Sequence, residues 1–250
     1  MCPDRPAITD DAILGGRLHL LQPKRGHRFG HDAILLAACI PAKRGEHAVE
    51  FGSGVGAASL ALLARVRGIA VTMIETDPAL AALAAQNIAR NDFAPSARVV
   101  VLDAGATARA FSARGVSAAD HVFMNPPFND ETRPSPHAAK RNAHVGSSRL
   151  LTRWVQSAAR LLRNNGSVTV IWRADGLQSV LEALSKNYGS IAILPVQGNL
   201  GGAAIRVIVR AVKGGRAPLS LNGGNNRPTA EAERVMRELA PLALAGAIKA

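Results

Sequence analysis

The sequence predicts an α/β fold in which helices cover both faces of a mostly parallel sheet. Five short apolar runs alternate with stretches of helical character over residues 45–186, and strands that alternate with helices form parallel sheets. Two further strands, 190–196 and 203–212, are separated by a short glycine-containing loop. Such a loop joins an antiparallel hairpin, whereas a parallel pair needs a longer crossover. We therefore expect one antiparallel strand in an otherwise parallel sheet.

Turn and cap signals place the individual elements. Gly15 and Gly16 indicate a hairpin, and Asp32 and Asp175 fit the N-caps of two helices. In chain order we expect a hairpin over 13–22, strands over 48–51, 71–75, 98–102, 119–125, 167–172, 190–196 and 203–212, and helices over 33–40, 57–67, 78–91, 148–162 and 176–186. Residues 1–12, 128–147 and 213–228 are expected to be irregular, and a last helix begins near 229.

The composition fits one domain of 250 residues with a sizeable core, because 48% of the residues are hydrophobic. We divide this domain into a hairpin and entry helix (1–44), a core (45–213), and a linker with a C-terminal helix (214–250). Cys2 and Cys39 lack CxxC spacing, and no signal-type apolar segment is found. This pattern predicts a cytoplasmic protein.

An excess of positive charge indicates an acidic partner. The chain has 30 Lys and Arg against 18 Asp and Glu, a net charge of +12, and nucleic acid is the commonest partner of so basic a chain. A membrane surface is less favoured, because no apolar run approaches the ~18 residues that a spanning helix needs. A basic surface that serves only solubility is the simpler alternative.

The sequence Asn125-Pro126-Pro127-Phe128 ends the predicted strand 119–125. Neither proline has an N–H to donate, so the strand must stop here, and ligands of open α/β sheets bind outside the carboxyl ends of strands. An amide, a rigid backbone and an aromatic ring at this place can hold a flat group that carries an NH2. A proline-rich turn closed by a core phenylalanine is the simpler interpretation of the motif alone.

A second constellation lies upstream at the same predicted edge. The glycine turn at Gly52, Gly54 and Gly56 lets a ligand touch the backbone, and Glu75 lies about 20 positions further on, as for a residue that binds ribose hydroxyls. Asp103 ends the next strand and would accept from an adenine amine, and Glu50 would face a cationic aminoacyl group.

Two classes of cofactor fit such a glycine turn. Residues 52–57 also fit GxGxxA, which is typical of nicotinamide dinucleotides. A pyrophosphate would be repelled by Glu50, whereas a ligand with a positive centre would be attracted by it. The set of carboxylates therefore favours S-adenosylmethionine, and no metal is expected.

The sequence resembles the class I S-adenosylmethionine-dependent methyltransferases of the N6-adenine type over roughly residues 13–245. The resemblance rests on Glu50-x-Gly52-x-Gly54-x-Gly56, Glu75-x-Asp77, Asp103-Ala104 and Asn125-Pro-Pro-Phe128. Its most specific part is Gln22-Pro23-Lys24-x-Gly26-x-Arg28-x-Gly30-x-Asp32-Ala33-x-Leu35-Leu36-Ala37. This segment is similar to the entry segment of bacterial methyltransferases that modify adenine-37 of a valine tRNA, and of their small-domain relatives.

The resemblance implies a Rossmann-like fold whose seven-stranded sheet has an antiparallel strand 7, and it implies roles for individual residues. Asp32 would lie near the methionine end of the cofactor. Asn125 and the Pro126 carbonyl would each accept one adenine N6–H, and Phe128 would stack on an unpaired base. The substrate would be RNA, with tRNA as the expected class. Phosphates would be held by Lys24, Arg25, Arg28, Arg133, Lys140 and Arg141.

Other functions remain open at this stage. The same pocket serves planar amide nitrogens in enzymes that methylate a glutamine of release factors, but those carry a separate N-terminal helical domain. Only ~30 residues precede the first helix here, which is short of an ordinary domain. Another RNA base, a small planar amine or RNA binding without turnover are further alternatives. A nicotinamide-dependent oxidoreductase would leave Asn125–Phe128 without a role.

Overall fold

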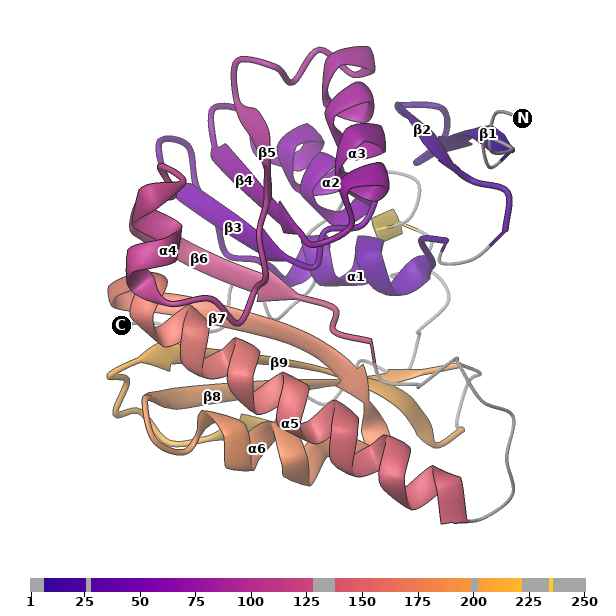
Figure 1. Ribbon diagram of the computed structural model, residues 1–250. Coiled ribbons are helices and arrows are strands. Elements are labelled where there is room, and N and C mark those ends of the chain that lie inside the picture. Colours follow the sequence, from indigo (N-terminus) through magenta and orange to yellow (C-terminus); the bar gives the residue numbers. More distant parts are fainter. Residues whose placement is uncertain (1–6, 26–27, 128–137, 199–201, 222–233, 236–250) are drawn as a thin grey trace.

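The computed structural model describes residues 7–25, 28–127, 138–198, 202–221 and 234–235, with only the backbone of 138–146 (Figure 1). It confirms the predicted α/β architecture. An eight-stranded sheet has the order β10-β8-β9-β7-β6-β3-β4-β5, and β9 runs antiparallel to both of its neighbours. The strands are β3 (His47–Phe51), β4 (Ala70–Glu75), β5 (Ala97–Val101), β6 (Ala119–Met124), β7 (Leu162–Arg173), β8 (Tyr188–Gln197), β9 (Ala204–Lys213) and β10 (Ser220–Leu221).

Seven of these strands form the sheet that the resemblance implies. The eighth, β10, pairs with β8 through two residues and lies in the segment expected to be an irregular linker. None of the described helices is both long and apolar enough to span a membrane.

Helices cover both faces of the sheet, as Figure 1 shows. One core contains side chains of α1, α2 and α3, and the other contains side chains of α4, α5 and α6. The helices are α1 (His31–Cys39), α2 (Ala57–Arg65), α3 (Pro78–Arg90), α4 (Ala108–Ala113), α5 (Ala138–Leu161) and α6 (Leu177–Leu184). The strands of the parallel part are buried on both faces, so their residues form near-continuous apolar runs.

A hairpin of β1 (Ile8–Ile13) and β2 (Leu18–Pro23) lies outside the main sheet. Two asparagines one turn apart, Asn87 on α3 and Asn91 at the C-cap of that helix, bind the backbone of β2. Asn87 is fully buried; its Oδ1 accepts from Leu21 N at 2.7 Å, and its Nδ2 donates to Leu21 O and Val55 O at 3.0 Å each. Asn91 makes the equivalent pair of bonds with His19. Asn87 therefore connects the hairpin to the turn after β3.

Three expectations about local structure are wrong. Residues 8–12 are part of β1, and residues 138–147, expected to be loop, are the first turns of α5, whose few apolar residues hid the helical pattern. Asp32 and Asp175 are not N-caps: Gly30 and Gly176 hold those positions without a side-chain bond. Each aspartate instead pairs with an arginine, Asp32 with Arg206 and Asp175 with Arg173. The predicted C-terminal helix lies almost wholly outside the described residues.

Replacing Asn87 by Ala would leave three backbone groups without partners. Because a buried unsatisfied group costs about 1–3 kcal/mol, we expect Asn87→Ala to lower the free energy of unfolding by about 3 kcal/mol or more. Asn91→Ala, at a more exposed site, is the matched control, with an expected loss of about 1 kcal/mol. Urea unfolding followed by tryptophan fluorescence measures both. Equal losses would show that Asn87 does not hold the hairpin.

Candidate functional site

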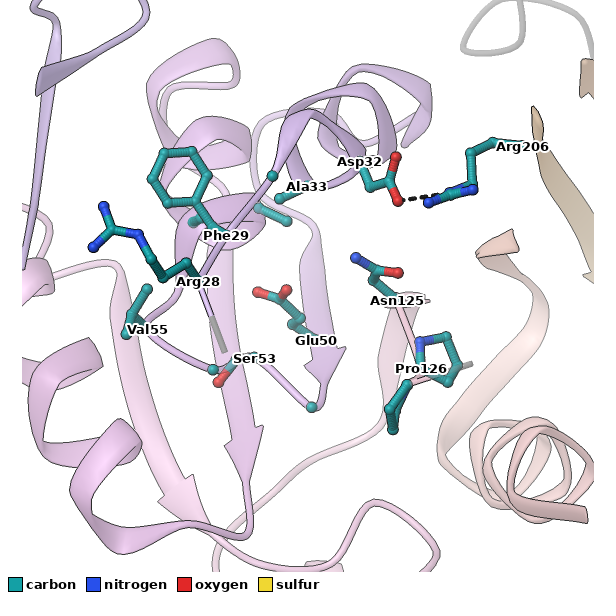
Figure 2. Close-up of a pocket in the computed structure, with 16 residues that line it drawn as sticks. Arg28, Phe29, Asp32, Ala33, Glu50, Ser53, Val55, Asn125, Pro126 and Arg206 are labelled. Atoms are coloured by element: carbon teal, nitrogen blue, oxygen red, sulfur yellow. Dashed lines mark hydrogen bonds and ion pairs between the residues drawn. The ribbon is translucent and has the colours of Figure 1, made fainter. Parts of the chain in front are cut away.

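Two adjoining cavities open at the carboxyl ends of the central strands. The larger, of about 480 Å³, lies between the turn after β3, α1 and the end of β6; Figure 2 shows its lining. The smaller, of about 200 Å³, is a mainly apolar slot between the ends of β4 and β5 and α5. Gly52, Gly54, Asn125 and Pro127 line both. The site thus lies where ligands bind in open α/β sheets.

The predicted glycine turn shapes the wall between β3 and α2. Gly52, Gly54 and Gly56 all have positive φ angles, of 67°, 54° and 88°, which residues other than glycine rarely adopt. A Cβ on Gly52 would also lie 2.5 Å from Cη2 of Trp154. Glycine is therefore needed at position 52 both for the turn and for the approach of α5.

Glu75, at the end of β4, is buried and fixes this turn. Its Oε2 accepts from Gly54 N at 2.7 Å, and its Oε1 accepts from Thr76 N and Asp77 N at 2.8 and 2.9 Å. A carboxylate offers about four lone-pair positions, so about one remains for a ligand hydroxyl. Glu75 lines the apolar slot, as its predicted contact with a ribose requires.

Glu50 is buried at the floor of the larger cavity. Its Oε2 accepts hydrogen bonds from the backbone N–H and the hydroxyl of Ser59, whereas its carboxylate faces the cavity in Figure 2. Burial, with a smaller contribution from the nearby charge of Glu75, raises the pKa of the Glu50 carboxyl to about 8, although the hydrogen bonds from Ser59 lower it. The site therefore contains a carboxyl group that a cationic ligand would ionise.

Asp103 lies at the rim of the slot. Its side chain is half exposed, accepts from Gly105 N and pairs with Arg153 at 3.3 Å. Its neighbours Leu102 and Ala104 line the slot, whereas Asp103 is not among the lining residues. The predicted contact between Asp103 and an adenine amine stays a prediction.

Asn125 lies directly after β6, at the junction of the two cavities. Its side-chain amide points into the larger cavity in Figure 2, and it has no hydrogen-bond partner within the described part of the chain. Pro126 is buried and lines the same cavity. Phe128, the third member of the predicted target pocket, lies outside the described residues.

Asp32 and Arg206 form an ion pair across the mouth of the larger cavity. Asp32 comes from the first turn of α1 and Arg206 from β9, with 2.8 Å between Asp32 Oδ2 and Arg206 Nε. About a quarter of each side chain is exposed. Asp32 thus lines the cavity as the resemblance implies, but it already has a cationic partner.

The predicted phosphate-binding residues fall into two groups. Lys24, Arg25 and Arg28 are exposed. Arg28 lines the cavity, but its guanidinium donates to Thr9 Oγ1, the Pro23 carbonyl and Asp11, which anchors the loop to the hairpin. Of the second group, Arg133 and the side chains of Lys140 and Arg141 lie outside the described residues.

Three lining residues were missed from the sequence. Trp154 and Ser53 are more than nine-tenths buried, and the indole Nε1 and the Ser53 hydroxyl have no hydrogen-bond partner among the described residues. Buried polar atoms normally have partners, so both atoms are candidates for contact with a ligand. Arg206 is the third. A tryptophan within an amphipathic helix reads as core, and the Asp32–Arg206 contact joins residues too distant in sequence to be foreseen.

The residues present fit a nucleoside ligand with a positive centre. The slot is apolar with one buried carboxylate, the glycine turn leaves backbone within reach, and Glu50 supplies a negative group in the adjoining cavity. Within the described residues, no group of three or more His, Cys, Asp or Glu side chains is placed to hold a metal ion.

Comparison with solved structures identifies the fold. A predicted O-methyltransferase from Agrobacterium tumefaciens has a TM-score of 0.69 at 24% identity, covering 84% of this chain and 98% of that one. TrmN from Thermus thermophilus has a TM-score of 0.55 at 18% identity, and the match covers 73% of this chain and 48% of TrmN. A SAM-dependent O-methyltransferase from Thermotoga maritima has a TM-score of 0.55 at 16% identity, and the match covers 78% of this chain and 69% of that one. The fold is that of Rossmann-like methyltransferases.

The family follows from the sequence. The model of the methyltransferase small domain matches residues 28–195, two thirds of the chain, so the protein belongs to that family. A search of curated proteins gives no match. Family and fold together make the protein a methyltransferase, and the fold implies S-adenosylmethionine as the methyl donor. The nicotinamide alternative is thereby set aside.

The contact between Gly52 and Trp154 can be tested with alanine. Gly52→Ala places a Cβ in a left-handed residue and against the indole ring, whereas Gly45→Ala, at φ 86° with open space around it, imposes only the backbone strain. We expect about 1–2 kcal/mol of destabilisation for Gly45→Ala and a further 1–3 kcal/mol for Gly52→Ala from overpacking. Thermal unfolding of the two variants measures the difference; equal shifts would contradict the close approach.

The raised pKa of Glu50 predicts how stability depends on pH. Between the ordinary value of 4.5 and about 8, the folded protein keeps a proton that the unfolded chain has released. The stability of the ligand-free protein therefore falls as pH rises through that window. Glu50→Gln should gain in melting temperature relative to the wild type from pH 5 to pH 8, whereas the exposed control Glu182→Gln should show a constant difference. A difference in melting temperature that stays constant with pH for Glu50→Gln would contradict the raised pKa of the Glu50 carboxyl.

Glu50 also predicts how the cofactor binds. The carboxylate would make a charge-assisted contact with a cationic group, and losing such a contact costs about 1.5–3 kcal/mol. We therefore expect Glu50→Gln to weaken S-adenosylmethionine binding by about 10- to 100-fold in isothermal titration calorimetry. Wild-type affinity should rise from pH 6 to pH 8. Unchanged affinity in the variant would place the cationic group elsewhere.

Proposed function

We propose that this protein is an S-adenosylmethionine-dependent N-methyltransferase that acts on the exocyclic amine of adenine in RNA, with tRNA as the expected substrate. The observation that carries the proposal is the position of Asn125. Its side-chain amide, which has no partner among the described residues, lies where the slot suited to the cofactor meets the larger cavity. A target group held there would be next to the methyl donor.

The cofactor would be held by residues of both cavities. Glu75 would accept a ribose hydroxyl, the buried Trp154 N–H and Ser53 hydroxyl would gain partners, and Glu50 would face the cationic aminoacyl end. Asp103 would reach the adenine amine from the rim, and Asp32 would lie near the methionine end. When bound, S-adenosylmethionine supplies an electrophilic methyl group.

Asn125 and Pro126 explain why the target would be an amine. The N6 lone pair of adenine is delocalised into the ring, so the amine is a poor nucleophile until its geometry changes. The Asn125 side-chain oxygen and the Pro126 carbonyl would each accept one N6–H and orient the lone pair. This needs preorganised acceptors and not a strong general base. A hydroxyl has one hydrogen to donate and would leave one acceptor unused.

The choice of RNA is supported by charge and by accessibility of the base. The chain carries a net charge of +12, and Lys24 and Arg25 are exposed in the segment that leads to Arg28, which lines the larger cavity. A base in a single-stranded loop reaches such a pocket at little cost, whereas a paired base must first be unstacked. Phe128 is proposed to stack on that base.

Replacing Asn125 tests the catalytic part of the proposal. Removing one preorganised polar group costs about 10²- to 10³-fold in rate, so Asn125→Ala should lose methyl transfer to that extent while still binding S-adenosylmethionine. Asn125→Asp keeps an acceptor oxygen and should retain more activity than Asn125→Ala. The exposed Asn164→Ala serves as the control. Unchanged turnover in Asn125→Ala would exclude this mechanism.

The substrate class is tested with radiolabelled S-adenosylmethionine and lysate of a strain that lacks the gene. Label that is lost to RNase and recovered as N6-methyladenosine is the expected result. Label lost only to protease would replace the proposal with methylation of a protein amide nitrogen.

A further inference from the structure

A second concave surface lies on the other side of α5 from the cofactor slot. An open groove of about 610 Å³ runs between α5 and the segment from the end of β7 to α6, which lie side by side in Figure 1. Its described lining contains no apolar side chain: Ser148, Arg149, Thr152, Arg153, Gln156, Asp175, Gly176 and Ser179. Apolar side chains line both cavities of the cofactor site, so the groove differs from them in the types of residue that line it.

The charge along α5 makes this groove basic. The helix sequence contains Lys140, Arg141, Arg149, Arg153 and Arg160 and no acidic residue. Arg149, Arg153 and Arg160 are exposed, and spacings of four and seven residues place them on one stripe of the helix. Because a helix rises about 1.5 Å per residue, the three arginines follow one another at about 6 Å and about 10 Å along the stripe.

The acidic residues near the groove are already paired. Asp175 lines it and forms an ion pair with Arg173, and Asp103 pairs with Arg153 at 3.3 Å. Arg149 has no ion-pair partner within the described part of the chain. The groove therefore keeps a net positive charge after its own carboxylates are counted.

The donors in this lining have the chemistry of nucleic-acid backbone contacts. Arginine, serine, threonine and glutamine side chains are among those that proteins use for phosphate oxygens and sugars, and they position a strand without reading its bases. We propose that the groove between α5 and α6 binds the sugar–phosphate backbone of the RNA strand that flanks the target nucleotide. This inference rests on the proposed function and adds a second contact surface to it.

The fold connects this surface to the site of transfer. Trp154 lines the cofactor slot, and the preceding residue, Arg153, lines the groove. One turn of α5 thus faces both, so a strand in the groove passes beside the carboxyl edge at which Asn125 lies. Backbone contacts here would fix the register of the strand and leave recognition of the base to the Asn125 pocket.

The test measures how RNA affinity depends on salt. Fluorescein-labelled total tRNA from the deletion strain is titrated with wild type, Arg149→Gln alone, and the double variant Arg149→Gln/Arg153→Gln. The control Arg67→Gln/Lys186→Gln removes the same charge from two exposed positions outside the groove. Each phosphate contact on a single strand contributes about 0.7 to the steepness of the slope of log K against log salt. The slope of the groove double variant, which lacks two such contacts, should therefore be shallower by about 1.4.

Binding of S-adenosylmethionine is measured in parallel, because Arg153 touches Asp103. If the slope is shallower in Arg149→Gln and in the groove double variant, and the control double variant keeps the wild-type slope, the result supports RNA binding in the groove. Equal slopes in both double variants, with RNA still methylated by the wild type, would overturn the groove and leave the proposed function standing. If the wild type methylates no RNA and polyglutamate binds at the groove instead, both proposals fail.

Discussion

The carboxylate of Glu75 is the constraint on which the site depends. It accepts three backbone N–H groups, one from the turn after β3 and two from the turn after β4, so a single side chain fixes two crossover connections. The carbonyl of Ile74 adds bonds from Gly52 and Ser53. The left-handed glycine turn is thus tied to the end of β4. Both cavities take their shape from that tie, because the turn forms a wall of each.

The same arrangement places two carboxyl groups in the site without a cationic group of the described residues between them. Glu50 and Glu75 are both buried at one edge of the sheet, and the charge of Glu75 adds to burial in raising the pKa of Glu50. Two buried carboxyls are costly unless a cation joins them. The methyl donor implied by the fold carries positive charge, so the feature that costs stability in the ligand-free protein also selects the ligand.

The sequence predicted the fold and the edge of the site because both depend on local signals. Pro126 and Pro127 end β6, three glycines turn the chain after β3, and Glu75 follows at the expected spacing. Contacts between distant elements could not be predicted: Arg206 reaches Asp32 from β9, Asn87 reaches β2, and Trp154 reaches the slot. Asp103 is a similar case: the sequence indicated its place at the end of a strand, but its pairing with Arg153 could not be predicted.

Helix α5 lines both the cofactor slot and the groove. Its inner face carries Trp154, whose ring lies so close to the turn that position 52 admits only glycine. Its outer face carries Arg149 and Arg153, next to the all-polar groove. Because a helix is rigid over one turn, the Gly52 contact that sets the width of the slot also sets the place of the arginines. Under the proposed function, the cofactor and the RNA backbone would be aligned by adjacent faces of the same helix.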